Sequence, residues 1–108
     1  MPKEKIKSKL VKEKVVTEDS DEAREFYNQS RFGKILESNK LQLSLIESLY
    51  LIEKGKLEVL DGRNKEITSE SFIKKARKIE PNFWIRYCVF KDMRNRGYIV
   101  KTALKFGA

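Results

Sequence analysis

The C-terminal part of the sequence gathers the side chains best suited to binding a phosphate. Residues 81–108 carry six basic residues, and only Asp92 is acidic there. Guanidinium and ammonium groups bind phosphate oxygens through charge-assisted hydrogen bonds. The candidates for such contacts are Arg94, Arg96, Lys101 and Lys105. A purely structural role competes for the two arginines, because cations at the end of a helix also offset its dipole.

The wider charge distribution points to the same class of partner. The 108 residues have a net charge of +8. Residues 55–108 hold 13 Lys and Arg against 6 Asp and Glu, whereas residues 1–54 are nearly balanced. A basic half favours a polyanion, most often nucleic acid. Solubility is the competing explanation for such a surplus.

Several classes of chemistry are excluded by what the sequence lacks. It contains no histidine and one cysteine, Cys88. Hydrolysis by a Ser-His-Asp or Cys-His arrangement is therefore impossible within these residues, and a structural zinc site is not expected. We predict neither a metal nor another cofactor. With no second cysteine for an internal disulfide, no secretory signal and no long apolar run, we expect a cytoplasmic protein without a membrane partner.

The first half of the chain predicts strands followed by two helices. Residues 5–17 are rich in lysine and β-branched side chains, which favours one or two short, exposed strands. A helix begins after Ser20, a good N-cap, and ends near 31–33. The next helix is predicted by apolar residues at helical spacing. These are Leu41, Leu45, Leu49 and Ile52, and Gly55 ends the helix.

The second half predicts a strand, two more helices and a last strand. The strand covers 56–60 and is closed by a turn at 61–65. A helix capped by Thr68 or Ser69 runs until Pro81 breaks it. A fourth helix covers 82–96 with Gly97 as its stop, and residues 98–106 predict a strand.

These elements predict an α+β fold, a small mixed domain of about four helices with short, mainly antiparallel strands. A boundary near Pro81 would divide the chain into units 1–80 and 81–108. The helix at 83–90 is apolar nearly all round and needs a surface to cover it. The candidates for packing or assembly are Trp84, Tyr87, Phe90, Tyr98 and Phe106.

Two stretches resemble a known family. "KLQLSLIESLYLIEKGKLEV" resembles the N-terminal domain of the archaeal tRNA-splicing (tRNA-intron) endonucleases, and "RYCVFKDMRNRGYIVKTALKFGA" resembles the opening of their catalytic domain. The positions that fit the second pattern are Tyr87, Val89, Asp92, Arg94, Arg96, Gly97, Tyr98, Val100, Lys101, Leu104, Lys105, Phe106 and Gly107. Phe90, Met93 and Ala103 stand where the family has tyrosine, leucine and glycine.

The resemblance implies an activity and also implies that these residues do not carry it out. The family cuts precursor tRNA at a bulge-helix-bulge motif without a metal and leaves a 2′,3′-cyclic phosphate. Its catalytic tyrosine, histidine and lysine all follow the Lys-Phe-Gly-Ala segment, at which this sequence stops. We therefore expect no catalytic residue here.

Three interpretations remain open at this point. The first is a non-catalytic unit of a tRNA-splicing endonuclease, joined in a hetero- or homo-oligomer to the subunit or domain that carries catalysis, and meeting precursor tRNA through that complex. The second is a free-standing basic module that binds nucleic acid. The third is a shortened form of a longer endonuclease. The strand at 98–106 would pair with the N-terminal part or with another chain, because an unpaired strand invites association.

Overall fold

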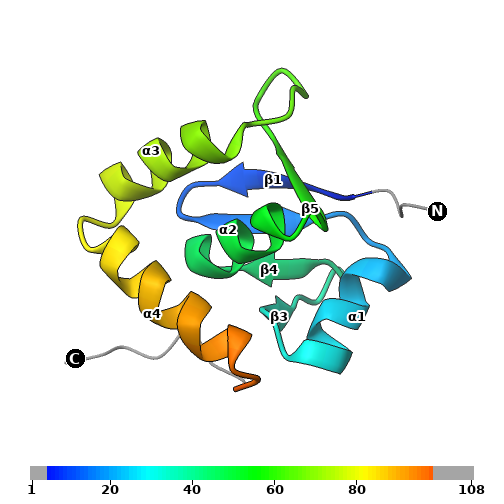
Figure 1. Ribbon diagram of the computed structural model, residues 1–108. Coiled ribbons are helices and arrows are strands. Elements are labelled where there is room, and N and C mark those ends of the chain that lie inside the picture. The colour runs from blue at the N-terminus through cyan, green and yellow to red at the C-terminus, as the bar shows by residue number, and fades with distance from the viewer. Residues whose placement is uncertain (1–4, 99–108) are drawn as a thin grey trace.

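The computed structural model describes residues 5–98, which form one mixed sheet with helices around it (Figure 1). The strands are β1 (Ile6–Val11), β2 (Lys14–Thr17), β3 (Lys34–Ile35), β4 (Leu41–Leu43) and β5 (Leu57–Leu60). Their order across the sheet is β3-β4-β2-β1-β5. The pairs β1–β2, β2–β4 and β3–β4 are antiparallel, and β1–β5 is parallel. The predicted α+β class with mainly antiparallel strands is therefore confirmed.

Four helices complete the described part of the chain. They are α1 (Asp21–Ser30), α2 (Leu45–Glu53), α3 (Ser69–Ile79) and α4 (Phe83–Asn95). Figure 1 shows α2 lying across one face of the sheet, with α1 at one end and α3 and α4 at the other. No helix among residues 5–98 is long and apolar enough to cross a membrane.

The helix ends follow the capping chemistry of the sequence. The side chains of Ser20 and Thr68 cap α1 and α3, as predicted. Each accepts a hydrogen bond from the backbone amide three residues further along the chain. Gly55 follows the C-cap of α2 with φ +74°, a conformation that suits glycine because it has no Cβ. Gly97, with φ +92°, lies just beyond α4.

The predicted start of the second helix is wrong. Leu41 belongs to β4, and α2 begins only at Leu45. The reason is a capping box: the Ser44 hydroxyl accepts from the Glu47 amide, and the Glu47 carboxylate accepts from the Ser44 amide. Leu41 and Leu43 are buried while Gln42 is partly exposed, which is the alternation of a strand. The short strand β3 was not predicted at all.

The N-terminal strands are less exposed than predicted. The inward side chains of β1 and β2, including Ile6 and Val15, are buried under α2, while Lys7 and Lys9 face the solvent. The hairpin therefore has one core face and one open face.

One core joins the sheet to the helices. It includes inward strand residues such as Val15 and Val59, Phe72 of α3, and Phe83 and Phe90 of α4. Because α4 contributes to the same core as the sheet, the physical packing crosses the segment around Pro81. The division of the chain into units 1–80 and 81–108 stays a prediction.

Candidate assembly surface and basic sites

Helix α4 has two apolar faces. Phe83, Tyr87 and Phe90 lie against the core and expose 3% or less of their surface. On the other side, Ile85 is 69% exposed and Val89 is 56% exposed. The second face is completed by Trp84, Met93 and Cys88, all of which are exposed. We call the set Trp84, Ile85, Cys88, Val89 and Met93 the outer face of α4.

The inner face of α4 is fixed to α2 by a polar contact. The Tyr87 hydroxyl donates a hydrogen bond to the Glu53 carboxylate, and the Lys91 ammonium lies 3.3 Å from the same oxygen. Burial and the hydrogen bond to Glu53 raise the pKa of Tyr87 above its usual value. A second link follows near the end of α4, where the Tyr50 hydroxyl donates to Asn95 Oδ1 at 2.9 Å.

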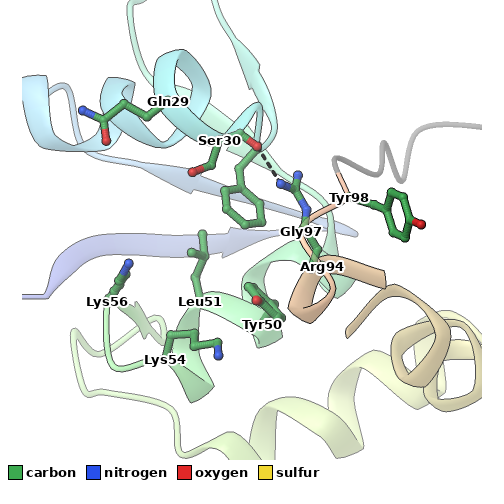
Figure 2. Close-up of a pocket in the computed structure, with 10 residues that line it drawn as sticks. Gln29, Ser30, Tyr50, Leu51, Lys54, Lys56, Arg94, Gly97 and Tyr98 are labelled. Atoms are coloured by element: carbon green, nitrogen blue, oxygen red, sulfur yellow. Dashed lines mark hydrogen bonds between the residues drawn. The ribbon is translucent and has the colours of Figure 1, made fainter. Parts of the chain in front are cut away.

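Arg94 connects α4 to the end of α1. Its guanidinium Nη1 donates to the carbonyl oxygen of Ser30 at 2.7 Å, as Figure 2 shows. The guanidinium carbon also lies 3.9 Å from the centre of the Phe32 ring. Burial lowers the pKa of Arg94, while the nearby Glu47 carboxylate opposes that shift. The side chain therefore joins α4 to the end of α1 and to the loop that follows it, which agrees with the structural role considered for it in the sequence.

An open cavity of about 500 Å³ lies between the ends of α1, α2 and α4 (Figure 2). Its lining combines cations with aromatic rings. The Lys54 ammonium lies 5.2 Å from the centre of the Tyr50 ring. Three helix C-termini meet here, each with its partial negative charge. The cations that line this cavity are therefore placed close to that negative charge, and Arg94 donates a hydrogen bond to the Ser30 carbonyl group at the end of α1.

The remaining predicted site residues are spread over the surface or lie outside the described range. Arg96 is exposed and forms an i,i+4 ion pair of 3.2 Å with Asp92. Tyr98 is 59% exposed, and its ring points away from Lys54 and Lys56 in Figure 2. Lys101, Lys105 and Phe106 lie outside the described residues, as does nearly all of the predicted strand 98–106. RNA contact by the four predicted cations stays a prediction.

Acidic residues do not gather into a metal site. Within residues 5–98, no group of three or more histidine, cysteine, aspartate or glutamate side chains is placed to hold a metal ion. The one buried carboxylate among the described residues, Glu47, accepts a hydrogen bond from the Gly33 amide at 2.8 Å besides those from Ser44. Its function is structural, because it fixes the loop before β3 to the start of α2.

Comparison with known proteins assigns this arrangement to a family. The protein-family model described as the tRNA intron endonuclease N-terminal domain matches residues 6–73. The model of the tRNA intron endonuclease catalytic C-terminal domain matches residues 83–108. The chain therefore belongs to the tRNA intron endonuclease family, and the resemblance noted in the sequence is confirmed.

Curated relatives agree with this assignment. The chain is 46% identical to the tRNA-splicing endonuclease of Thermococcus onnurineus over 106 residues, which cover 98% of this chain and 61% of the relative. It is 49% identical to that of Pyrococcus abyssi over 78% of this chain and 48% of the relative. For Methanosarcina barkeri the identity is 38%, over 98% of this chain and 30% of the relative. The chain thus spans 61% or less of the length of these relatives.

The outer face of α4 is the feature that sequence reasoning did not resolve. The predicted packing set included Trp84 but not Ile85 or Val89. A spacing of i,i+4 places these two side chains on one side of a helix, so the pattern held the signal. What the pattern could not show is which apolar side of α4 the core would take.

Proposed function

We propose that these residues form a non-catalytic unit of a tRNA-splicing endonuclease, which helps to assemble the enzyme that cuts precursor tRNA at intron boundaries. Family membership supports the general role in tRNA splicing. In this proposal, precursor tRNA meets the chain through the assembled, oligomeric enzyme in the cytoplasm.

The observation that carries the assembly role is the double-sided helix α4. Its inner face is part of the core, and its outer face leaves Ile85 and Val89 more than half exposed. A helix that is apolar on both sides is typical of one packed between two layers. This helix also begins the segment that matches the catalytic domain model. We infer that the outer face of α4 packs against the rest of that catalytic domain, carried by the same polypeptide or by another.

The catalytic groups come from outside these 108 residues. Cleavage by the 2′-hydroxyl of RNA needs a base, an acid and a cation for the charge on the phosphate. The family uses tyrosine, histidine and lysine for these steps, and the sequence here has no histidine. Tyr87 is a poor candidate for a base because it is buried and bound to Glu53, which raises its pKa.

A cleavage assay tests this function. Two proteins are incubated with an intron-containing precursor tRNA. The first is the 108-residue chain alone. The second, the exchanged enzyme, is the Thermococcus onnurineus endonuclease in which the 106 aligned residues are replaced by those of this chain. We expect the chain alone to leave the RNA intact and the exchanged enzyme to cut it at both intron boundaries. Cleavage by the chain alone would show that it is catalytic. An exchanged enzyme that folds but does not cut would contradict the assembly role.

A further inference from the structure

One face of the sheet carries cations, and no helix among residues 5–98 lies over it (Figure 1). Along β1, Ile6 and Ser8 point into the core, so Lys7 and Lys9 point the other way. The same alternation places Lys14 of β2 and Lys34 of β3 on this outward side. We call Lys7, Lys9, Lys14 and Lys34 the basic sheet face.

The strand register gives this face a defined geometry. Lys9 lies opposite Val16, Val16 lies opposite Gln42, and Gln42 lies opposite Lys34. Lys9 and Lys34 are therefore at the two ends of one row that crosses four strands, roughly 14 Å apart at about 4.8 Å for each strand spacing. Lys7 is two residues from Lys9 on the same strand, at about 6.7 Å. The ammonium groups are thus spread across several strands on the outward side of the sheet.

Within residues 5–98, no ion pair neutralises the four lysines of this face. The cations with carboxylate partners in that range are Lys5, Arg24, Arg86, Lys91 and Arg96. The lysines of α3 likewise form no ion pair with the described residues, so they supply a charge-matched control. Two carboxylates share this side of the sheet. Glu58 lies next to Lys7 in the parallel register, and Glu66 lies opposite Leu60, which is itself next to Lys9. Because Lys5 neutralises Glu66, the four lysines and Glu58 leave three more positive than negative charges.

The chemistry of the face defines the kind of ligand. None of its strand residues is aromatic, so it has no platform on which an unstacked base could lie. Lysine on an exposed sheet face binds phosphate as a point charge, independently of base sequence. Such a surface fits the phosphate backbone of a helical RNA better than a single strand.

We propose that the basic sheet face binds the phosphate backbone of a base-paired part of the RNA substrate, on the opposite side of the sheet from α2. This inference rests on the proposed function, since it places the precursor tRNA of that function on a specific surface. The face would hold the body of the RNA by shape and charge, while cleavage takes place elsewhere in the assembled enzyme.

Two charge-matched triple variants test the proposal. K7Q/K9Q/K34Q removes three charges from the basic sheet face, and K74Q/K75Q/K78Q removes three from the exposed side of α3. Binding of the 108-residue chain to an intron-containing precursor tRNA is measured over a range of salt concentrations. We expect the sheet variant to lose at least about tenfold in affinity and the magnitude of its log–log salt slope to fall by up to about three, because each of the three phosphate contacts releases close to one counterion. The α3 variant should stay within about threefold of the unsubstituted chain.

One further variant and one competitor RNA make the outcome decisive. K7R/K9R/K34R keeps the charges and should keep the affinity, which separates loss of charge from loss of fold. A plain RNA duplex of similar length should compete with the precursor. Equal losses of RNA affinity in the sheet and α3 variants would show that only net charge matters and would overturn the proposal. An unchanged RNA affinity of the sheet variant, or a change in its self-association alone, would also overturn it.

The failure of this inference differs from the failure of the proposed function. If the exchanged endonuclease cuts RNA but the sheet variant binds normally, only the RNA surface is wrong. If the exchanged enzyme does not cut while the sheet variant loses RNA binding, the assembly role is wrong and a free-standing RNA-binding module is favoured.

Discussion

The Tyr87 hydroxyl of α4 donates its hydrogen bond to the Glu53 carboxylate of α2. Tyr87 is 1% exposed, and its ring stacks at 6.1 Å on Phe83, another core residue of α4. The contact joins the segment matched by the catalytic domain model to the segment matched by the N-terminal model. It thereby sets which side of α4 remains free.

Removing this hydroxyl should lower the stability of the folded chain without changing its fold. We expect Tyr87→Phe to lower the free energy of unfolding by about 1.5–3 kcal/mol, the usual range for a hydrogen bond to a charged group. Urea unfolding followed by circular dichroism measures the change. Tyr98→Phe is the control, because Tyr98 is largely exposed and its substitution should leave stability unchanged within about 0.5 kcal/mol. Equal stability of the two variants would contradict a stabilising contact with Glu53.

The same contact predicts a stability loss at alkaline pH. The pKa of Tyr87 in the folded chain lies above its ordinary value of 10.0. The unfolded chain therefore releases this proton first, so the stabilisation is complete below about pH 10 and declines as the pH rises further. The difference in unfolding free energy between the unsubstituted chain and Tyr87→Phe should shrink between pH 9 and pH 11, values chosen to span the ordinary tyrosine pKa of about 10. A constant difference over this range would argue against a raised pKa.

Gly33 should tolerate no side chain. Its φ is +68°, and a Cβ there would lie 2.4 Å from the carbonyl oxygen of Gln42 in β4. We expect Gly33→Ala to cost more than about 2 kcal/mol, since both the left-handed conformation and the backbone clash oppose it. Gly62→Ala is a matched control, because nothing lies within 4 Å of its added Cβ. Thermal unfolding of the two variants checks the prediction, and similar melting temperatures would be inconsistent with it.

Substitution of the two arginines near the end of α4 should affect stability to different extents. Arg94→Gln removes the hydrogen bond to Ser30 and the contact with the Phe32 ring, and we expect a loss of about 1–3 kcal/mol. Arg96→Gln removes an exposed pair with Asp92, which contributes about 0.5 kcal/mol or less. Chemical denaturation separates the two variants. A stability loss of the same size in both would show that Arg94 has no special structural function.

Local elements of this fold were predictable because their signals are local. Ser20 and Thr68 cap helices through their own side chains, and Gly55 ends α2 through its own backbone freedom. Leu41 was predicted to be helical because its spacing to Leu45 fits a helix. The capping box at Ser44 overrides this spacing, so the helix begins only after Ser44.

The candidate surfaces were less predictable because they depend on pairing between distant segments. The sequence predicts a strand at Lys9 but none at Lys34, and only the register through Val16 and Gln42 aligns the two in one row. In the same way, the hydrogen bond from Arg94 to the end of α1 depends on two segments far apart in the sequence, so the spacing of the basic residues could not predict it.

The central claim is that the outer face of α4 joins this unit to the catalytic part of an endonuclease. The most direct test is the cleavage rate of the exchanged Thermococcus onnurineus enzyme carrying Ile85→Glu and Val89→Glu, two exposed positions whose substitution should leave the unfolding of the isolated 108-residue chain unchanged. We predict at least a tenfold loss of cleavage of precursor tRNA, because two carboxylates would be buried in an apolar interface. A cleavage rate equal to that of the unsubstituted exchanged enzyme would contradict the claim.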